Sequence, residues 1–396
     1  MKVSPATGDM IPALAKNDRE FKELCEDTEQ PIVVQALLAA RLAAKSTIEE
    51  TRTARLLKLS LLRWPDGSTG WAPVPLKYSA ARTHRLGGDD LSNWQNLKRG
   101  SRIRAAIEAP PGYRIVHRDA SQIEARMVAW LAGCTLLLAA FADPKRDVYA
   151  EFATSVYGFP VDKNTHPGPR FVGKTGVLQL NYGAGPPKFR HALFIGNGGM
   201  SMKIELDESK RIVYHYRRLY KEVPELWEIG AWIINAVVSN SGRSAPLPYH
   251  PAPPATMPFK IGYDSVWLPN GMCLSYPELQ YRRDAGTGEL EAFYKNAYGS
   301  WVKLYGAKFI ENWSQALSRI IITDAAERIY DDTGYHPFLS AHDSLSYCVP
   351  ESEVAWWDQR LEYEFSIVPS WATRLPLASE GGWGVNLLAA EKRINQ

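Results

Sequence analysis

The chain has 396 residues, 45% of them hydrophobic, and a formal net charge of +3, so it can bury the cores of two or three subdomains. No apolar run is long enough to cross a bilayer, and the first ten residues lack the apolar segment of a secretory signal. Four widely spaced cysteines argue against a zinc cluster or a disulfide framework and favour a reducing cytoplasm. The small net charge neither requires nor excludes a nucleic-acid partner.

The first predicted elements are helices at residues 17–60, with Asp18 as N-cap and Pro31 in the first turn of a second helix. The Ala- and Leu-rich stretch 31–62 is typical of a long packed helix. Residues 64–100 are basic and rich in turn-forming types, which favours loops.

A strand is predicted at residues 113–119, and a helix follows it because Ile123, Met127 and Leu131 recur at helical spacing. The later elements are predicted as mostly helix at 147–240, a proline-rich loop at 245–259, a β-meander at 260–294, a long helix at about 303–332, and two short strands within 336–350. The last two strands are joined tightly at His342 and Asp343.

Two nucleotide-site motifs are present without the context that they need. Residues 168–175 fit the phosphate-loop pattern, but no apolar strand precedes them, and they suit a helix that starts near Pro169. Residues 117–119 spell the HRD of a protein-kinase catalytic loop, but Glu124 stands where the magnesium-binding Asn is needed. We therefore reject both the phosphate-loop and the kinase interpretations.

A stripe of four residues follows one side of the helix predicted at 169–183. Arg170, Lys174, Leu178 and Tyr182 are spaced four apart, so they wind slowly around one side. Two cations can hold a triphosphate, and an aromatic ring can cover a base. The alternative is a solvated basic face, which is the commoner explanation for such a stripe alone.

Two aspartates end predicted strands. Asp119 ends one strand, and Asp343 lies at the tip of the short hairpin. If they converge, the two carboxylates could hold two Mg²⁺ ions for in-line phosphoryl transfer. Taken singly, Asp119 is explained as a helix cap and Asp343 as a turn former.

The long C-terminal helix carries two adjacent stripes. The apolar stripe is Phe309, Trp313, Ala316 and Ile320, and the polar stripe is Lys308, Asn312, Gln315 and Arg319. The amides suit contacts with the sugars, phosphates and minor-groove edges of a duplex, although chance alignment is the alternative.

Together these segments resemble the phage-type branch of the family A DNA polymerases. The matching segments, in the family's order over residues 75–390, are THRLGGDDLSNWQN, RDASQIEARMVAWLAG, RFVGKTGVLQLNYG, ENWSQALSR and SAHDSLSYCVP. Each motif alone is weak to moderate, but five in the right order make the resemblance specific.

The resemblance implies a role for each matching position. Asp119 and Asp343 would bind the metals with the carbonyl of Ala120, and Glu124 would be the steric gate against a ribose 2′-hydroxyl. Arg170 and Lys174 would hold the incoming triphosphate, Lys174 also protonating pyrophosphate, with Leu178 and Tyr182 beside the nascent base pair. The implied contacts to primer–template DNA are Arg85, Asn93, Gln95, Asn96, Gln315 and His342.

Four positions depart from the family pattern. Ala120 replaces a Tyr after the first catalytic Asp, and Ser344 replaces the Glu after the last, so the third acid is dispensable or metal binding is altered. Leu178 replaces the aromatic residue of bacterial members, although phage-type members resemble it here. Tyr149 aligns with a phosphate-contacting His and puts that contact in doubt.

The resemblance implies an α+β right-hand polymerase fold, with a palm of antiparallel strands, helical fingers and a short helical thumb. The expected divisions are a shortened thumb at 1–75, the first part of the palm at 76–130, fingers at 131–258 and the second part of the palm at 259–396. Few residues precede the first motif, so we expect no proofreading exonuclease domain, weak proofreading and low processivity without help from another protein.

The implied activity is template-directed addition of deoxynucleoside triphosphates to a primer 3′-OH with two Mg²⁺ ions, or Mn²⁺ as a substitute. The expected protein is a monomer in the cytoplasm, of a bacterial host if phage-encoded, with a separate exonuclease or processivity factor as a further partner. Two rivals stay open: a single-subunit RNA polymerase, against which Glu124 argues, and an inactive remnant that only binds primer–template.

Overall fold

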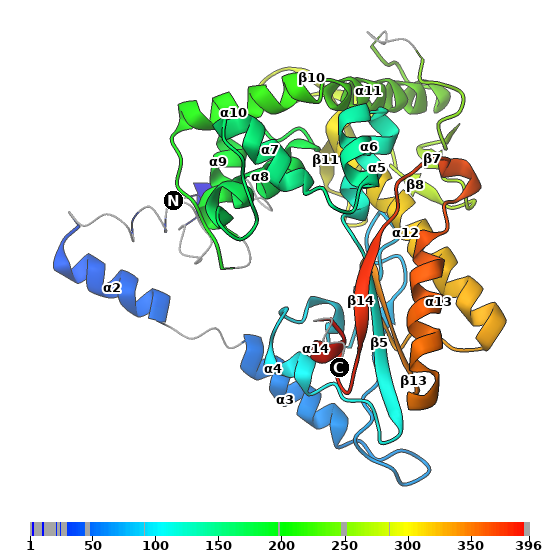
Figure 1. Cartoon of the computed structure of the whole chain (residues 1–396). Helices are drawn as coiled ribbons and strands as arrows, with labels where there is room; N and C mark the ends of the chain where they lie inside the picture. The colour runs from blue at the N-terminus through cyan, green and yellow to red at the C-terminus, as the bar shows by residue number, and fades with distance from the viewer. Residues whose placement is uncertain are drawn as a thin grey trace. The chain divides into compact units, whose positions relative to one another are not determined.

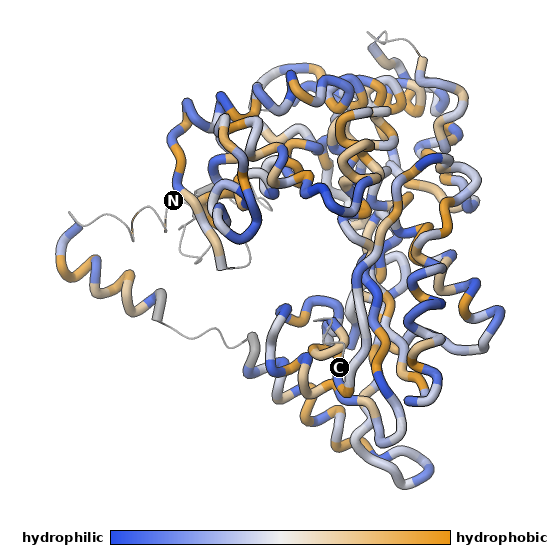
Figure 2. Tube along the Cα trace, in the orientation of Figure 1, coloured by the Kyte–Doolittle hydropathy of each residue, from blue (hydrophilic) through white to orange (hydrophobic). Residues whose placement is uncertain are grey.

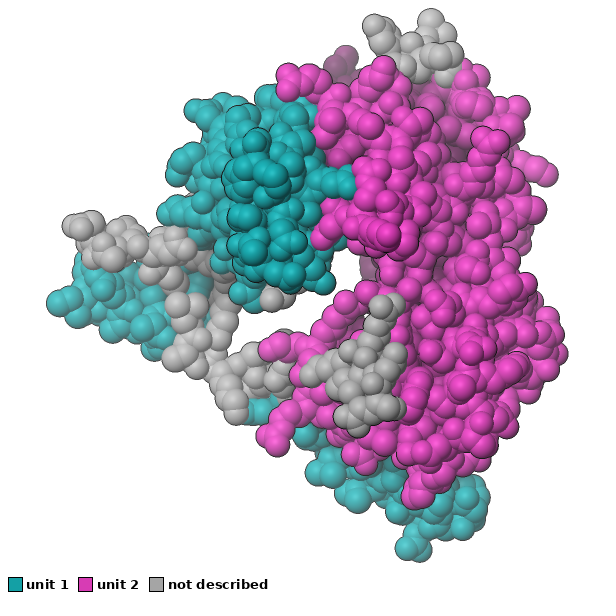
Figure 3. Space-filling model, viewed as in Figure 1, with its two compact units in different colours: residues 1–70, 149–176, 184–215 teal, residues 71–148, 177–183, 216–396 magenta. Residues whose placement is uncertain are grey.

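The computed structural model describes residues 2–3, 10–11, 21, 24, 30–43, 48–90, 92–196, 199–246, 252–284 and 286–391 (Figure 1). Its contacts form two compact units (Figure 3). The first comprises residues 1–70, 149–176 and 184–215, and the second comprises residues 71–148, 177–183 and 216–396. The division into palm, fingers and thumb follows other boundaries and stays a prediction.

A four-stranded antiparallel sheet lies at the centre of the second unit. Its strand order is β12 (Leu339–Ala341), β13 (Ser344–Pro350), β5 (Tyr113–Ala120) and β14 (Ser379–Gly384). The register places Ser344 and Glu380 on either side of Asp119. The strand predicted at 113–119 and the hairpin that turns at His342 and Asp343 are therefore confirmed.

Helices bury the apolar side chains of this unit. Helix α5 (Ile123–Ala132) packs against α11 (Glu222–Asn240) and α12 (Gly306–Thr333), and α13 (Val354–Ser366) packs on β5, β13 and β14. Met127 and Trp313 are fully buried among them. The shorter elements of this unit are β3 (Leu76–Lys77), β4 (Gly87–Gly88), η1 (Trp94–Asn96), α4 (Arg102–Ala105), α6 (Thr135–Ala142), η2 (Glu351–Glu353), η3 (Ser370–Ala372) and α14 (Leu387–Glu391).

Helices α11 and α12 touch backbone to backbone. A Cβ on Gly306 would lie 1.9 Å from the Trp227 carbonyl oxygen, and one on Gly230 would lie 2.6 Å from the Gly306 carbonyl oxygen. We expect Gly306→Ala to lower the free energy of unfolding by about 1–3 kcal/mol, because the helices must separate. Thermal melting checks this, with Gly185→Ala as control, since its Cβ meets nothing nearer than 3.9 Å. An unchanged melting temperature for Gly306→Ala would disprove this close packing.

The helical region predicted at 147–240 is confirmed as α7 (Val148–Tyr157), α8 (Pro167–Leu180), α9 (Pro186–Ile195), α10 (Leu206–Leu219) and α11. The phosphate-loop match lies inside α8, so it is helix and not loop. Gly173 lets α8 approach α7 closely, because a Cβ there would lie 2.0 Å from the Tyr149 carbonyl oxygen.

The predicted β-meander is present, but it forms two three-stranded sheets. The strands are β6 (Lys260–Gly262), β7 (Ser265–Trp267) and β8 (Cys273–Ser275), then β9 (Gln280–Arg283), β10 (Leu290–Lys295) and β11 (Trp301–Leu304). The long helix begins at Gly306 and not at 303, because residues 301–304 pair with β10. The described residues of the loop 245–259 contain no helix or strand.

The N-terminal region differs from the expected long packed helix. Its elements are β1 (Lys2–Val3), β2 (Met10–Ile11), α2 (Ile32–Ala43) and α3 (Ile48–Ser60). The apolar residues of α2, coloured orange in Figure 2, are largely exposed: Ile32 is 83% and Leu37 65% exposed. The expectation of one long packed helix is wrong, because the stretch forms two helices and the apolar residues of α2 are largely exposed. Asp18 lies outside the described residues.

No helix in the described part of the chain is long and apolar enough to cross a membrane.

Candidate active site

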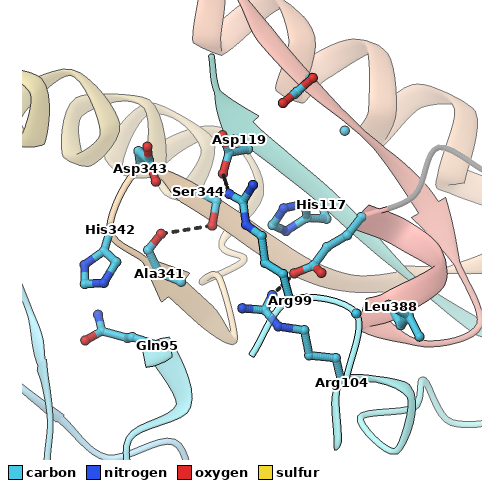
Figure 4. Close-up of a pocket in the computed structure, with 14 residues that line it drawn as sticks. Gln95, Arg99, Arg104, His117, Asp119, Ala341, His342, Asp343, Ser344 and Leu388 are labelled. Atoms are coloured by element: carbon cyan, nitrogen blue, oxygen red, sulfur yellow. Dashed lines mark hydrogen bonds and ion pairs between the residues drawn. The ribbon is translucent and has the colours of Figure 1, made fainter. Parts of the chain in front are cut away.

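The sheet register brings Asp119 and Asp343 together. Asp119 pairs with Ser344 across β5 and β13, and the Ala120 N–H donates to the Asp343 carbonyl oxygen at 2.9 Å. Both aspartates line one cavity of about 420 Å³ (Figure 4). Its other lining residues are Gln95, Arg99, Gly100, Arg104, His117, Ala341, His342, Ser344, Glu380, Gly381, Leu388 and Glu391.

The turn between β12 and β13 explains how Asp343 reaches this cavity. His342 has a φ of 57°, in the left-handed region, which reverses the chain within two residues. The Ser344 hydroxyl donates to the Ala341 carbonyl oxygen at 3.0 Å and closes the turn. Asp343 is thereby held beside the end of β5.

Both carboxyl groups resist ionisation in this position. Burial, and then the charge of Asp343, raise the pKa of Asp119 to about 7. Burial likewise raises the pKa of Asp343. Arg99 lies 3.3 Å from Asp119 Oδ2 and partly offsets the effect (Figure 4). Two partly buried acids that line one cavity and repel each other's charge form a site that a cation stabilises.

The donor set at this pair fits a hard divalent cation. Carboxylate oxygens are the ligands that Mg²⁺ prefers, and the guanidinium of Arg99 already brings a positive charge to Asp119. Within the described ranges, no three or more His, Cys, Asp or Glu side chains are grouped to hold a metal. The ligand role of the Ala120 carbonyl stays a prediction.

Glu124 lies at the centre of a second polar cluster, in the first turn of α5. Arg85 forms an ion pair with Oε1 of Glu124. The Tyr182 hydroxyl and the Gln315 amide donate to Oε2 at 3.2 and 3.4 Å. Tyr182 also lies 3.3 Å from the Ser314 hydroxyl. Four predicted site residues from four segments therefore meet.

Several predicted DNA contacts are engaged within the protein. Gln95 is buried and donates to the Ser340 carbonyl oxygen at 2.8 Å, and Asn312 is buried and donates to the Tyr276 hydroxyl at 3.1 Å. Asn93 caps η1 by accepting the Asn96 N–H at 3.1 Å. These hydrogen bonds give Gln95, Asn93 and Asn312 structural roles within the protein. Asn96 and His342 have exposed side chains.

Arg170 and Lys174 belong to the first compact unit, four residues apart on α8. The Arg170 guanidinium lies 5.6 Å from the centre of the Tyr149 ring, and Lys174 is exposed. Leu178 is on the same helix but belongs to the second unit. Tyr182 also belongs to the second unit. The expected helical stripe is wrong at its end, because α8 stops at Leu180 and Tyr182 lies in the turn that follows.

Some residues that line the cavity, among them His117 and Arg99, were not predicted as site residues from the sequence. His117 is two residues before Asp119 on β5, and alternate residues share a face, so this signal was present. Its Nδ1 lies 2.8 Å from the Ser346 hydroxyl, and burial and nearby arginines lower its pKa to about 4, so it stays neutral. Arg99 lies in a loop, where no sequence pattern marks it.

Comparison with known proteins shows the fold and the family of the chain. A solved structure, the POL domain of Pol1 from M. smegmatis in complex with DNA primer-template and dNTP, matches 95% of this chain and 56% of its own, with TM-score 0.63 and 21% identity. The fold is thus the α+β right-hand polymerase fold. The model of DNA polymerase family A matches residues 17–231, more than half of the chain, so the chain belongs to this family.

Two curated relatives show the extent of the similarity. The DNA polymerase of Bacillus phage SP02 is 26% identical over 94% of this chain and 59% of its own length. The thermostable DNA polymerase I of Thermus aquaticus is 26% identical over 54% of this chain and 24% of its own length. The chain therefore spans less than two thirds of these relatives.

Proposed function

We propose that the chain extends a primer 3′-OH by template-directed addition of deoxynucleoside triphosphates. The observation that carries this proposal is the meeting of Asp119 and Asp343 at one cavity in a member of DNA polymerase family A. The Pol1 structure with primer-template and dNTP supports the same substrates for this chain.

Each site residue of the chain would have its own role in the reaction. Asp119 and Asp343 would hold two Mg²⁺ ions, which supply charge stabilisation for in-line phosphoryl transfer. Arg170 and Lys174 would bind the triphosphate oxygens, and Lys174 would give a proton to the departing pyrophosphate. Glu124 would exclude a ribose 2′-hydroxyl, with Tyr182 beside the new base pair.

Primer extension tests the proposal directly. A labelled primer on templates of four different sequences should grow only with the complementary deoxynucleotide, only with Mg²⁺ or Mn²⁺, and not after chelation. Growth independent of the template, or no growth with any divalent ion, would refute the proposal. Growth with ribonucleotides alone would favour a single-subunit RNA polymerase, and DNA binding without growth would favour an inactive remnant.

Lys174→Ala should lower kcat/KM for the incoming deoxynucleotide by about 10²–10³-fold, because one cation on the transferred phosphates is lost. Steady-state extension of a single nucleotide measures this. Lys163→Ala is the control, since Lys163 is also exposed and lies just before α8. Equal activity of the two variants would contradict the assignment of Lys174.

Weak proofreading and low processivity stay predictions for this chain. A primer with a mispaired 3′ end should keep its length during incubation with Mg²⁺ and no nucleotides. Extension in the presence of a DNA trap should yield short products. Rapid shortening of the primer, or long products from one encounter, would contradict these predictions.

A further inference from the structure

Arg85 and Glu124 form a half-buried ion pair that joins two distant segments. Arg85 lies between β3 and β4, and Glu124 lies in the first turn of α5. Their side chains are 25% and 27% exposed, so solvent screens the pair only partly. The sequence suggested a DNA contact for Arg85, whereas in the structure its guanidinium is on the carboxylate of Glu124.

The three donors on Glu124 are not equivalent. Tyr182 and Gln315 both donate to Oε2, whereas Arg85 is on Oε1. Burial raises the pKa of Tyr182 to about 12, so its hydroxyl keeps the proton that it donates at neutral pH. The bond from Arg85 is the stronger one, because it is the one of the three in which the donor and the acceptor are both charged. Its loss would leave the carboxylate held at one oxygen only.

We propose that Arg85 is a positioning residue for sugar selection: it fixes the Glu124 carboxylate so that the gate excludes a 2′-hydroxyl. The inference rests on the proposed function, because it assumes that Glu124 is the gate. A steric gate excludes the 2′-hydroxyl only if its side chain keeps its position. A carboxylate that is hydrogen-bonded at both oxygens rotates less freely than one bonded at a single oxygen. Arg85 thus sets selectivity through Glu124 and not through the substrate.

Two substitutions separate charge from geometry. Arg85→Gln removes both the charge and the forked donor, whereas Arg85→Lys keeps a positive charge near Glu124 with a single ammonium. Arg82→Gln is the matched control, because Arg82 lies on the same segment but its guanidinium is 4.1 Å from the centre of the Tyr294 ring. Each full-length variant is compared with the unsubstituted protein by circular dichroism before kinetics.

The measured quantity is the ratio of kcat/KM for a ribonucleotide to that for the matching deoxynucleotide on one template. We expect Arg85→Gln to raise this ratio about tenfold, Arg85→Lys to raise it less, and Arg82→Gln to leave it unchanged. The double variant Arg85→Gln with Glu124→Ala should show the ratio of Glu124→Ala alone, because Arg85 acts only through Glu124.

Other outcomes overturn the inference. If Arg85 acts only on the duplex, Arg85→Gln weakens use of both sugars equally and the ratio does not change. If the two substitutions multiply in the double variant, Arg85 does not act through Glu124. Failure of the proposed function is distinct, because the unsubstituted protein would then extend no primer.

Discussion

Replacing Asp119 or Asp343 by asparagine is expected to abolish Mg²⁺-dependent primer extension, with a fall in rate of at least roughly 10³-fold. Asparagine keeps the size of the side chain but removes the charge that binds a divalent cation. A thousandfold loss corresponds to about 4 kcal/mol of transition-state stabilisation, a scale that loss of one metal-binding acid readily reaches.

Single-turnover extension with saturating enzyme measures this effect and separates it from binding. Asp331→Asn is the control, because Asp331 is exposed on α12 and lies outside the cavity. Primer–template affinity, measured by fluorescence anisotropy, should be nearly unchanged in all three variants. An extension rate of Asp119→Asn or Asp343→Asn within tenfold of the unsubstituted protein would remove the two-aspartate site from the proposal.

The elements that carry the two acids were predictable from the sequence because their signals are local. Residues 113–119 hold the strand-favouring residues Tyr113, Ile115 and Val116 and end in Asp119, and the β12–β13 hairpin turns at the polar pair His342 and Asp343. Their meeting is not a local property, since the acids are far apart in the chain. The family resemblance implied that the two acids meet, and the antiparallel register of β5 and β13 brings them together.

The surroundings of polar side chains were harder to predict from the sequence than the secondary structure of the backbone. Gln95 and Asn312 have the right type and spacing for a duplex contact, yet both are buried and bonded to protein oxygens. A sequence pattern shows which residues share a helix face, but not what packs against that face. The predicted start of α12 at about residue 303 is too early, because residues 301–304 pair with β10.

The same aspartates should make the folded protein less stable above pH 7 than near pH 4. The pKa of Asp119 is raised from 3.8 to about 7 in the folded state, so this state binds the proton more tightly than the unfolded chain. The free energy of unfolding therefore falls as the pH rises from about 4 to 7, and it stays low above pH 7. Asp119→Asn removes this penalty and should stabilise the protein at pH 8.

Thermal melting at pH 5 and pH 8 without divalent ions measures the difference. At pH 8, where the native carboxylate is charged, we expect the free energy of unfolding of Asp119→Asn to exceed that of the unsubstituted protein by about 1–3 kcal/mol. At pH 5 we expect a smaller difference. Asp331→Asn is again the control, because Asp331 is exposed on α12 and lies outside the cavity. Mg²⁺ should raise the melting temperature of the unsubstituted protein at pH 8 more than that of Asp119→Asn. A variant that melts below the unsubstituted protein at pH 8 would mean that the two carboxylates stabilise the fold, and the reason to expect a cation between them would be lost.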